Sequence, residues 1–372
     1  MKNNLETLTK LRLLLDVEGI GPAKLFNLLS KFQSLDNLLG SNYNSLLNVD
    51  GISQNLANRI LKQFAKYPTF KTKISEELEK LKALGGNWLT FWSENYPVNL
   101  KNIFDPPILL YYKGTLNSKD NNSVAIVGTR MASQYGKTYA SRFAEELAQK
   151  EITIVSGMAR GIDSAAHRGA LNSGGRTLAI IGSGLDIIYP PENKHLFNQI
   201  AENGAVITEY KLGTKPDAQN FPKRNRIISG ISLGTLVVET KIKGGALQTA
   251  SFALDQNKEV FAIPGNLGKP QSEGSNLLIQ KGEAKLVKNS NDILVELNLK
   301  IEPEVGKNIP KPVEDLNMFE QKIYEFLSDE PKHIDEIANA TKINSADCLV
   351  HLLSLEFRSL IKQLPGKMFI LE

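Results

Sequence analysis

The sequence contains one cysteine, Cys348, and only four histidines among 372 residues. A single cysteine cannot form a disulfide framework within the chain or a cysteine-based zinc site. Four scattered histidines leave few ligands for a catalytic metal. The composition therefore argues against a metalloenzyme and against a disulfide-stabilised secreted domain.

Long apolar segments are also absent. No apolar run approaches the roughly 18 residues that a membrane-spanning helix requires. The leucines near the start of the chain are interrupted by Glu6, Lys10 and Arg12, so this segment lacks the apolar core of a signal peptide. We therefore expect a cytosolic protein, and the chain is long enough for two or three domains.

The net charge of +4 is small, but it is unevenly distributed. Residues 1–118 and 119–298 each carry +4, whereas residues 316–372 carry −3. Binding of a polyanion depends on the local density of lysine and arginine rather than on the total charge. Such a partner should contact the first two segments, and the acidic C-terminal segment is a poor candidate.

A proline-rich segment, residues 301–312, interrupts the folded pattern of the chain. It contains three prolines and few apolar residues, which is typical of an extended linker. Together with the patterns on either side, it predicts a helical helix-hairpin-helix-like domain, a Rossmann-like core, a linker and a winged-helix domain. Their predicted bounds are residues 1–95, 96–298, 299–315 and 316–372.

Two similar segments, residues 15–25 and 47–57, occur in the helical N-terminal part. Each places a glycine turn between leucine-rich helical patterns, which indicates helix-hairpin-helix units. Glycine in such a turn lets backbone N–H groups approach a phosphate, but the same turn also serves as a corner for helix packing. The sequence leaves both roles open.

The C-terminal part has the pattern of three helices followed by a hairpin. The helical patterns cover residues 319–328, 334–340 and 345–357, with Ser345 as a candidate cap, and the hairpin covers residues 360–370. This order predicts a winged helix.

Apolar, β-branched runs alternate with helical patterns in the middle of the chain. Continuous apolar strands separated by helices indicate a parallel sheet that is covered on both faces. We therefore predict an α/β, doubly wound Rossmann-like fold, with one further strand at residues 105–114. The runs lie at residues 124–127, 152–155, 177–181, 205–208, 233–239 and 259–263.

The loops after several of these strands combine small residues with cations. In a doubly wound sheet every strand-to-helix loop emerges at the carboxyl edge, so motifs distant in sequence meet there. Residues 128–136 and 156–163 each add an arginine before a helix N-terminus, where free N–H groups favour an anion. Residues 221–229 supply three cations, an amide and an aromatic, and residues 241–249 supply two lysines. Because clustered cations repel one another without an anionic partner, we predict phosphate binding at this edge.

A dinucleotide cofactor is not expected, because no loop has the complete G-x-G-x-x-G pattern. Gly182 and Gly184 begin such a pattern, but Ile187 stands where its last glycine belongs. The sequence therefore predicts no cofactor.

Acidic residues and a histidine near these loops do not assemble into a catalytic set. Asp163 and His167 are one helical turn apart and could pair, although a structural hydrogen bond at the helix start is the simpler interpretation. Glu209 and Glu239 end strands near the cations, and we expect them to orient arginines or cap loops rather than to act as bases.

Taken in order, these motifs resemble the DNA-processing protein A family, also called DprA or Smf. The resemblance covers roughly residues 95–290, and the flanking helical and winged-helix segments agree with the usual layout of the family. The matching blocks are Tyr96-Pro97 to Leu100, residues 107–114, 124–130 with Ser133 and 135–136, 156–163 with 166–167 and 169–171, 184–186 with 189–190, 221–232 and 237–239, Pro264-Gly265, and residues 274–276.

The resemblance implies a protein that is not an enzyme. It implies binding of single-stranded DNA, dimerisation, and help in loading the RecA recombinase during natural transformation. Two departures from the family pattern occur. Thr129 replaces a frequent serine, and Lys243-Gly-Gly-Ala-Leu-Gln-Thr249 replaces the usual Lys-Ser-Gly-Ser-Leu-Ile-Thr. Lys243 and backbone N–H groups would then provide the phosphate contact at that loop.

We expect a groove across the carboxyl edge that holds successive phosphates and leaves the bases largely unread. Phe221 would offer a stacking surface, and Asn225 would bridge a phosphate or order the neighbouring arginines. The candidate residues are Gly128, Thr129, Arg130, Ser156, Gly157, Arg160, Gly161, Phe221, Lys223, Arg224, Asn225, Arg226, Lys241, Lys243, Gly244 and Gly245.

A second interpretation is a Rossmann-type nucleoside-monophosphate phosphoribohydrolase, whose signature is P-G-G-x-G-T-x-x-E. The segment from Gly234 to Glu239 imitates it, but no Pro-Gly-Gly precedes and the acid comes one residue late. A one-residue shift in a strand places the acid on the opposite face.

Two surfaces outside the groove carry further expectations. Leu277 and Leu278 are candidates for an isologous dimer interface. The helix predicted at residues 345–357 contains no lysine or arginine, so we expect the winged-helix domain to contact a protein rather than DNA.

Overall fold

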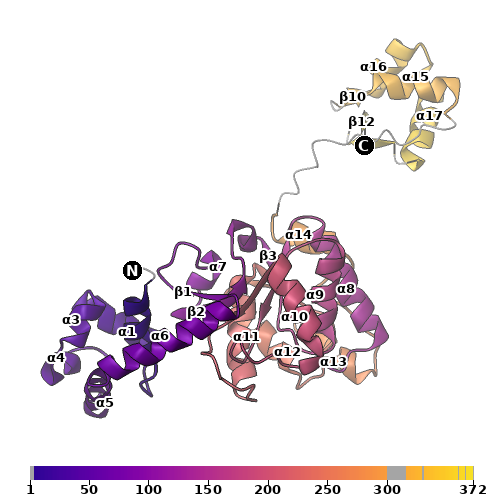
Figure 1. The fold of residues 1–372 in the computed structure, drawn as a ribbon. Coiled ribbons are helices and arrows are strands. Elements are labelled where there is room, and N and C mark those ends of the chain that lie inside the picture. Colours follow the sequence, from indigo (N-terminus) through magenta and orange to yellow (C-terminus); the bar gives the residue numbers. More distant parts are fainter. Residues whose placement is uncertain (1–3, 300–315, 329–330, 359, 365, 372) are drawn as a thin grey trace. The chain divides into compact units, whose positions relative to one another are not determined.

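The structure is a computed structural model that describes residues 4–299, 316–328, 331–358, 360–364 and 366–371. The chain divides into two compact units, residues 1–301 and 302–372 (Figure 1). The predicted linker lies outside the described residues except for Leu299. Within the described residues, no helix is long and apolar enough to cross a membrane.

The first unit begins with short helices that bury their leucines. Gly19 and Gly51 have φ values of +98° and +79°, a conformation that glycine adopts without strain, and each lies in a turn between two helices. The predicted helix-hairpin-helix units are therefore confirmed. The helices are α1 (Leu5–Leu15), α2 (Pro22–Phe32), α3 (Leu35–Leu39), α4 (Tyr43–Leu47), α5 (Gln54–Phe64) and α6 (Tyr67–Ala83).

These helices pack directly on the sheet. The buried guanidinium of Arg12 in α1 donates to the Tyr111 hydroxyl and, at 3.0 Å, to Glu77 in α6. Leu8 and Ile74 share an apolar cluster with the sheet residue Val206. Burial of this apolar surface joins the helical segment and the sheet into one unit.

The sheet has nine strands in the order β1-β2-β6-β5-β4-β3-β7-β8-β9. Strands β3 to β9 run parallel to their neighbours, but β2 pairs antiparallel with both β6 and β1. The predicted parallel sheet is thus confirmed, and the further strand predicted at residues 105–114 joins its edge in the antiparallel direction. The strands are β1 (Gly86–Thr90), β2 (Leu109–Gly114), β3 (Ser123–Val127), β4 (Thr153–Ser156), β5 (Thr177–Ile180), β6 (Gly204–Thr208), β7 (Gly234–Val237), β8 (Glu259–Ala262) and β9 (Lys285–Leu286).

Helices cover both faces of this sheet, as the continuous apolar strands predict. Residues of α11, α12 and α13 form one buried apolar layer with the sheet, and residues of α8, α9 and α14 form the other. The helices are α7 (Val98–Lys101), α8 (Gln134–Ala148), α9 (Ile162–Asn172), α10 (Lys194–Asn203), α11 (Asn220–Ile231), α12 (Gly245–Asp255), α13 (Pro270–Gln280) and α14 (Ser290–Glu296), with short 3₁₀ turns η1 (Ser118–Asn121) and η2 (Pro191–Asn193).

The second unit has the predicted three helices and hairpin around its own apolar cluster. The side chain of Asn344, rather than Ser345, caps α17 by accepting from the Asp347 N–H. The elements are α15 (Met318–Phe326), β10 (Lys332–His333), α16 (Ile334–Thr341), α17 (Ser345–Phe357), β11 (Ile361–Leu364) and β12 (Met368–Leu371).

Candidate nucleic-acid interface

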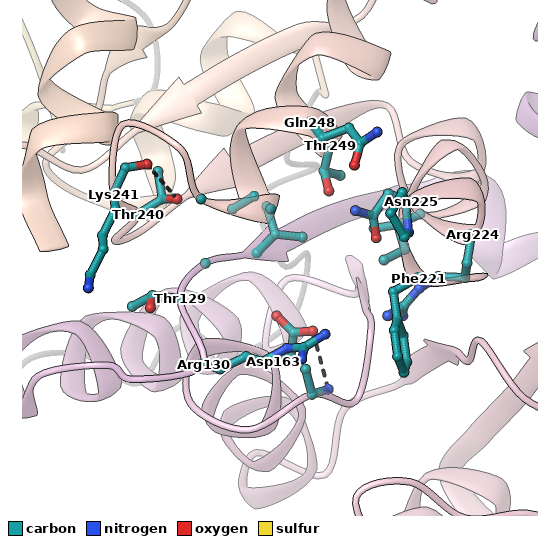
Figure 2. A pocket seen from close by; sticks show the side chains of 18 of the residues that line it. Thr129, Arg130, Asp163, Phe221, Arg224, Asn225, Thr240, Lys241, Gln248 and Thr249 are labelled. Atoms are coloured by element: carbon teal, nitrogen blue, oxygen red, sulfur yellow. Dashed lines mark hydrogen bonds between the residues drawn. The ribbon is translucent and has the colours of Figure 1, made fainter. Parts of the chain in front are cut away.

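A cavity of about 730 Å³ opens at the carboxyl edge of the central strands (Figure 2). Its walls are the loops after β3 and β7, the first turns of α11 and α12, and Tyr189 from the segment after β5. Segments that are distant in sequence therefore form one site, as the doubly wound topology predicts.

The loops after β3 and β4 pack closely because they contain glycine. Gly161 has a φ of +76°, and a Cβ there would collide with the backbone oxygen of Thr129. A Cβ at Gly157 would meet the guanidinium of Arg224 and the carboxylate of Asp163. These glycines make room for neighbouring protein groups. Ser156 has a structural role as well, because its hydroxyl donates to the Ile126 carbonyl at 2.6 Å.

Arg130 projects from the loop after β3 and is exposed. Its guanidinium carbon lies 5.1 Å from the ring centroid of Phe221, within the range of a cation–π contact. Phe221 also lies beside Tyr189, with ring centroids 5.7 Å apart. The predicted cation and the predicted aromatic are thus neighbours at the cavity wall.

Residues 221–229 form the first turns of α11 rather than a loop. Consecutive helical residues are rotated by about 100°, so their side chains cannot all face one groove. Asn225 faces the cavity and Lys223 is exposed outside its lining. Of the three predicted cations in this segment, Lys223, Arg224 and Arg226, the cavity lining includes Arg224.

Arg224 points inward and is only 4% exposed. Its Nη1 donates to the Ile180 carbonyl, and it lies close to Asp163 beneath the cavity. Burial lowers the pKa of Arg224 to about 10, while Asp163 acts in the opposite direction. Burial likewise raises the pKa of Asp163, and Arg224 opposes that shift. Arg224 therefore forms part of the cavity floor.

Arg226 and Arg160 already have carboxylate partners. Arg226 donates to Glu209 at 2.7 Å and to Asp105 at 3.2 Å, so Glu209 orients an arginine, as expected. Arg160 pairs with Glu192 at the surface, where both side chains are about half exposed. Exposed ion pairs of this kind contribute little to stability, so Arg160 can readily exchange Glu192 for another anion.

The loop after β7 presents its cations openly. Lys241 and Lys243 are exposed and form no ion pair within the described residues. Gly244 precedes α12 without a side-chain cap, and the Cα of Gly245 faces open space. The free N–H groups of α12 are consequently accessible from the cavity.

The family described as DNA recombination-mediator protein A matches residues 87–298, which is more than half of the chain. The chain belongs to the DprA/Smf family. A DprA winged-helix domain matches residues 310–367, and a SAM-like tandem of helix-hairpin-helix units matches residues 11–66. The resemblance inferred from the ordered motifs is therefore confirmed.

Relatives in this family align with most of the chain. The Smf protein of Synechocystis is 34% identical over 94% of this chain and 95% of its own length. The X-ray structure of DprA from Streptococcus pneumoniae matches with a TM-score of 0.68 and 34% identity, covering 80% of this chain and 99% of that one. DprA from Helicobacter pylori, whose structure concerns its single-stranded DNA binding mode, matches with a TM-score of 0.51 and 32% identity over 57% of this chain and 95% of that one.

Asp163 and His167 form hydrogen bonds with other groups, and no hydrogen bond joins the two within the described residues. Asp163 accepts from the Ala159 N–H at 3.3 Å, at the start of α9, and His167 Nδ1 lies 2.7 Å from the Thr177 hydroxyl. Burial, assisted by Arg224, lowers the pKa of His167 to about 3. The structural interpretation of both residues is confirmed.

Glu239 has the expected role of a loop cap. Its carboxylate accepts from the Ser133 N–H at 2.9 Å and from the Ser133 hydroxyl at 2.5 Å. These two hydrogen bonds hold the loop after β3 against the end of β7. A carboxylate in this role provides no support for the phosphoribohydrolase interpretation.

Sequence reasoning missed several residues that line the cavity. Gln248 and Thr249 come from the first turns of α12, and Tyr189 comes from the segment after β5. Gln248 lies in the block that departs from the usual family pattern. This departure was the one signal in the sequence that could have indicated a role for Gln248. Tyr189 belongs to a matching block, but its sequence has no basic residue to indicate an anion site.

Proposed function

We propose that this protein binds single-stranded DNA without strong sequence preference at the carboxyl edge of its sheet. The observation that carries the proposal is the set of three cations around the 730 Å³ cavity, Arg130, Lys241 and Lys243, which have no ion-pair partner within the described residues. Family membership and the single-stranded DNA binding mode of the Helicobacter pylori relative support it.

In this proposal each part of the cavity has a distinct role. Lys241, Lys243 and the open N-terminus of α12 hold phosphates. Arg130 holds a further phosphate, and Phe221 offers its face to a base. Arg224 acts indirectly, because its bonds to the floor position α11 and hence Phe221.

We further propose that two copies act together and assist loading of RecA onto DNA in the cytosol during natural transformation. Two linked sites on one strand bind more tightly than one, because the second contact is intramolecular. Leu277 is half-buried in α13, but Leu278 is 5% exposed and packs in the core. Leu278 therefore cannot present its side chain to a second copy, and the interface proposal is limited to Leu277 and its exposed neighbours.

We propose no catalytic role for the cavity, since Asp163 in its lining and His167 on the same helix are engaged in structural hydrogen bonds. Incubation of the purified protein with nucleoside monophosphates tests this directly. Release of free base, abolished by Glu239→Gln, would support the phosphoribohydrolase instead.

The main test is a salt-titrated binding assay with single-stranded DNA, duplex DNA and RNA of matched length. We expect the tightest binding for single-stranded DNA, with log K falling by about 0.7 per neutralised phosphate for each unit of log salt. Equal affinity for duplex and single strands, or no salt dependence, would contradict the proposal.

A further inference from the structure

The second helix-hairpin-helix unit and the start of α6 carry a local excess of positive charge. Residues 51–75 contain no aspartate or glutamate and five exposed cations, Arg59, Lys62, Lys66, Lys71 and Lys73. Because like charges at this density repel one another, an anionic partner is the simplest explanation for their presence.

Three of these cations lie along one face of α5 and its last turn. Arg59, Lys62 and Lys66 follow one another at intervals of three and four residues, which places them on the same side of a helix. Ala65 keeps right-handed helical backbone angles, so this face extends to Lys66. These three residues are called the α5 stripe below.

The first helix-hairpin-helix unit shows that the fold does not require this charge. The first repeat begins at residue 15 and the second at residue 47, so corresponding residues are 32 positions apart. The buried side chains of Leu28 and Ile60 correspond in this way. The residues of the first repeat that correspond to the α5 stripe are all uncharged, namely Asn27, Ser30 and Ser34.

Arg59 forms a hydrogen bond that a neutral side chain forms in the other repeat. Asn27 Nδ2 donates to the Asp50 carbonyl at 3.3 Å, and Arg59 Nη1 donates to the corresponding Glu18 carbonyl at 3.2 Å. An amide therefore satisfies this contact between the repeats, and the guanidinium adds a charge that the contact does not need. The ion pair of Arg59 with the Glu18 carboxylate contributes little to stability, because the two side chains are 55% and 91% exposed.

Lys66 stands where the first repeat has a capping residue. Ser34 is the N-cap of α3, and its hydroxyl accepts from the Asn37 N–H at 3.0 Å. Lys66 is the N-cap of α6 and forms no side-chain cap. An ammonium cannot accept from the free N–H groups of a helix, and it lies beside the positive end of the helix dipole. Serine would stabilise this position better, so the lysine indicates a use outside the fold.

The two lysines of the α5 stripe are available to a ligand. Lys62 and Lys66 are exposed and have no ion-pair partner within the described residues. The stripe extends for about 10 Å along the helix, because each residue adds about 1.5 Å. A row of this length can contact successive phosphates of a nucleic-acid backbone.

The segment after β6 connects the cavity with the helical segment that carries the α5 stripe. Pro216 of this segment lines the 730 Å³ cavity. Lys211 of the same segment lies 3.4 Å from the carboxylate of Asp16, the C-cap of α1. Glu18, two residues farther along the chain, contacts Arg59. A strand that leaves the cavity over this segment therefore approaches the stripe.

We propose that the α5 stripe is a second phosphate-binding surface, which takes a part of the single-stranded DNA that extends beyond the cavity. This inference rests on the proposed binding of single-stranded DNA. The contacts are independent of sequence, because lysine and arginine reach the backbone and not the base edges. The stripe raises the affinity for long strands only, since a second contact on the same strand is intramolecular.

The test compares oligo-dT of about 10 nucleotides, a length within the footprint of a single binding module, with oligo-dT of about 40. The variant Lys62→Ser/Lys66→Ser gives the second repeat the residues of the first. It should bind the long strand about tenfold more weakly, with a salt slope shallower by about 1.4, because two phosphate contacts are lost. Its affinity for the short strand should stay within about twofold of wild type.

The variant Lys119→Ser/Lys150→Ser is a control with the same loss of charge. Both lysines are exposed and precede β3 and β4, at the amino edge of the sheet and opposite the cavity. This variant should bind both lengths as the wild type does. An equal loss of long-strand affinity in the two variants would assign the effect to net charge and overturn the inference.

Lys66→Ser alone separates binding from folding. We expect a higher urea midpoint of unfolding, because the serine caps α6 as Ser34 caps α3, together with weaker binding of the long strand. A structural role for Lys66 requires the opposite, a lower midpoint. A lower midpoint, or unchanged binding of the long strand, would remove Lys66 from the proposed surface.

The failures of the two proposals are distinguishable. Wild-type binding of both lengths by Lys62→Ser/Lys66→Ser would overturn the second surface and leave the proposed function intact. Equal weakening for both lengths would also overturn the second surface, because the two lysines would then act on the segment held in the cavity. Absence of binding to either length by the wild-type protein would overturn the proposed function itself.

Discussion

Arg226 donates a hydrogen bond to Glu209 across 2.7 Å, and this ion pair is largely withdrawn from solvent. The pair joins the second turn of α11 to the end of β6, and Asp105 adds a second carboxylate to the same guanidinium. Although the sequence suggests a DNA-binding cation at this position, the geometry assigns Arg226 to the architecture of the site.

We therefore predict that Arg226→Met destabilises the fold. Glu209 would lose its cation while it remains buried, which costs about 3 kcal/mol. Urea unfolding measures the loss, and the double variant Arg226→Met/Glu209→Gln should recover part of it because the uncompensated charge is gone. The salt slope of DNA binding should remain that of the wild type. A stable Arg226→Met protein with weakened binding and a shallower slope would show that Arg226 contacts phosphate.

Arg130→Glu should cripple single-stranded DNA binding and leave the fold intact. The side chain is exposed and has no ion-pair partner within the described residues, so its replacement removes a phosphate contact and adds a repulsive charge. The salt slope should become shallower by about 0.7 or more. Fluorescence anisotropy at several salt concentrations checks both changes, and wild-type affinity and slope would remove Arg130 from the interface.

Dimerisation is predicted at micromolar concentration and is measured by light scattering. Leu277→Glu should shift the population toward monomer, because it places a charge in an apolar contact. Val295→Glu is a matched control, since Val295 is exposed on α14. A wild-type monomer, or equal behaviour of the two variants, would refute an interface that includes Leu277.

Removal of residues 301–372 should leave the affinity for single-stranded DNA within a few-fold of wild type. Helix α17 has no lysine or arginine, and its exposed face is apolar at Leu349, Val350 and Leu353. Such a face suits a protein contact better than a phosphate backbone. The binding free energy should weaken by less than about 1 kcal/mol, because the truncation removes no phosphate contact. A drop of a hundredfold or more in a truncated dimer would instead assign DNA contacts to this unit.

Lys258 should make stability depend on pH in the alkaline range. Burial lowers its pKa to about 8 in the folded protein, and its ammonium donates to the carbonyls of Ser229 and Gly230 at the end of α11. Below pH 8 both states carry the proton, and the buried charge opposes folding. Between about pH 8 and 10.5 only the unfolded state retains it, so stability rises with pH. Urea unfolding at pH 7.5 and 9.5 should show this rise in the wild type and a flat response in Lys258→Met, and a rise of equal size in both would assign it to another group.

Much of the architecture could be predicted because it depends on local patterns. Each apolar run from Val124 to Ile263 became a strand, and the C-terminal patterns became three helices and a hairpin. The approach of Arg130, Lys241 and Lys243 to one cavity also followed from sequence, since strand-to-helix loops of a parallel sheet share one edge. Strands β1 and β9 were missed, because short pieces at the sheet edges carry weak apolar patterns.

The sequence by itself determined which segments carry the chemically important side chains. It shows which loops carry cations, which segment carries the aromatic, and that the C-terminal segment is acidic. Only the tertiary structure decided which cations are buried, which are paired with a carboxylate and which are exposed. Arg224 and Arg226 stand on either side of Asn225, yet the first is buried in the cavity floor against the Ile180 carbonyl, the second is held by Glu209 outside the lining, and Asn225 faces the cavity. The physical reason is that a charged side chain is positioned by partners that come from other segments, and by the rotation of the helix that carries it, and neither is encoded in the neighbouring residues.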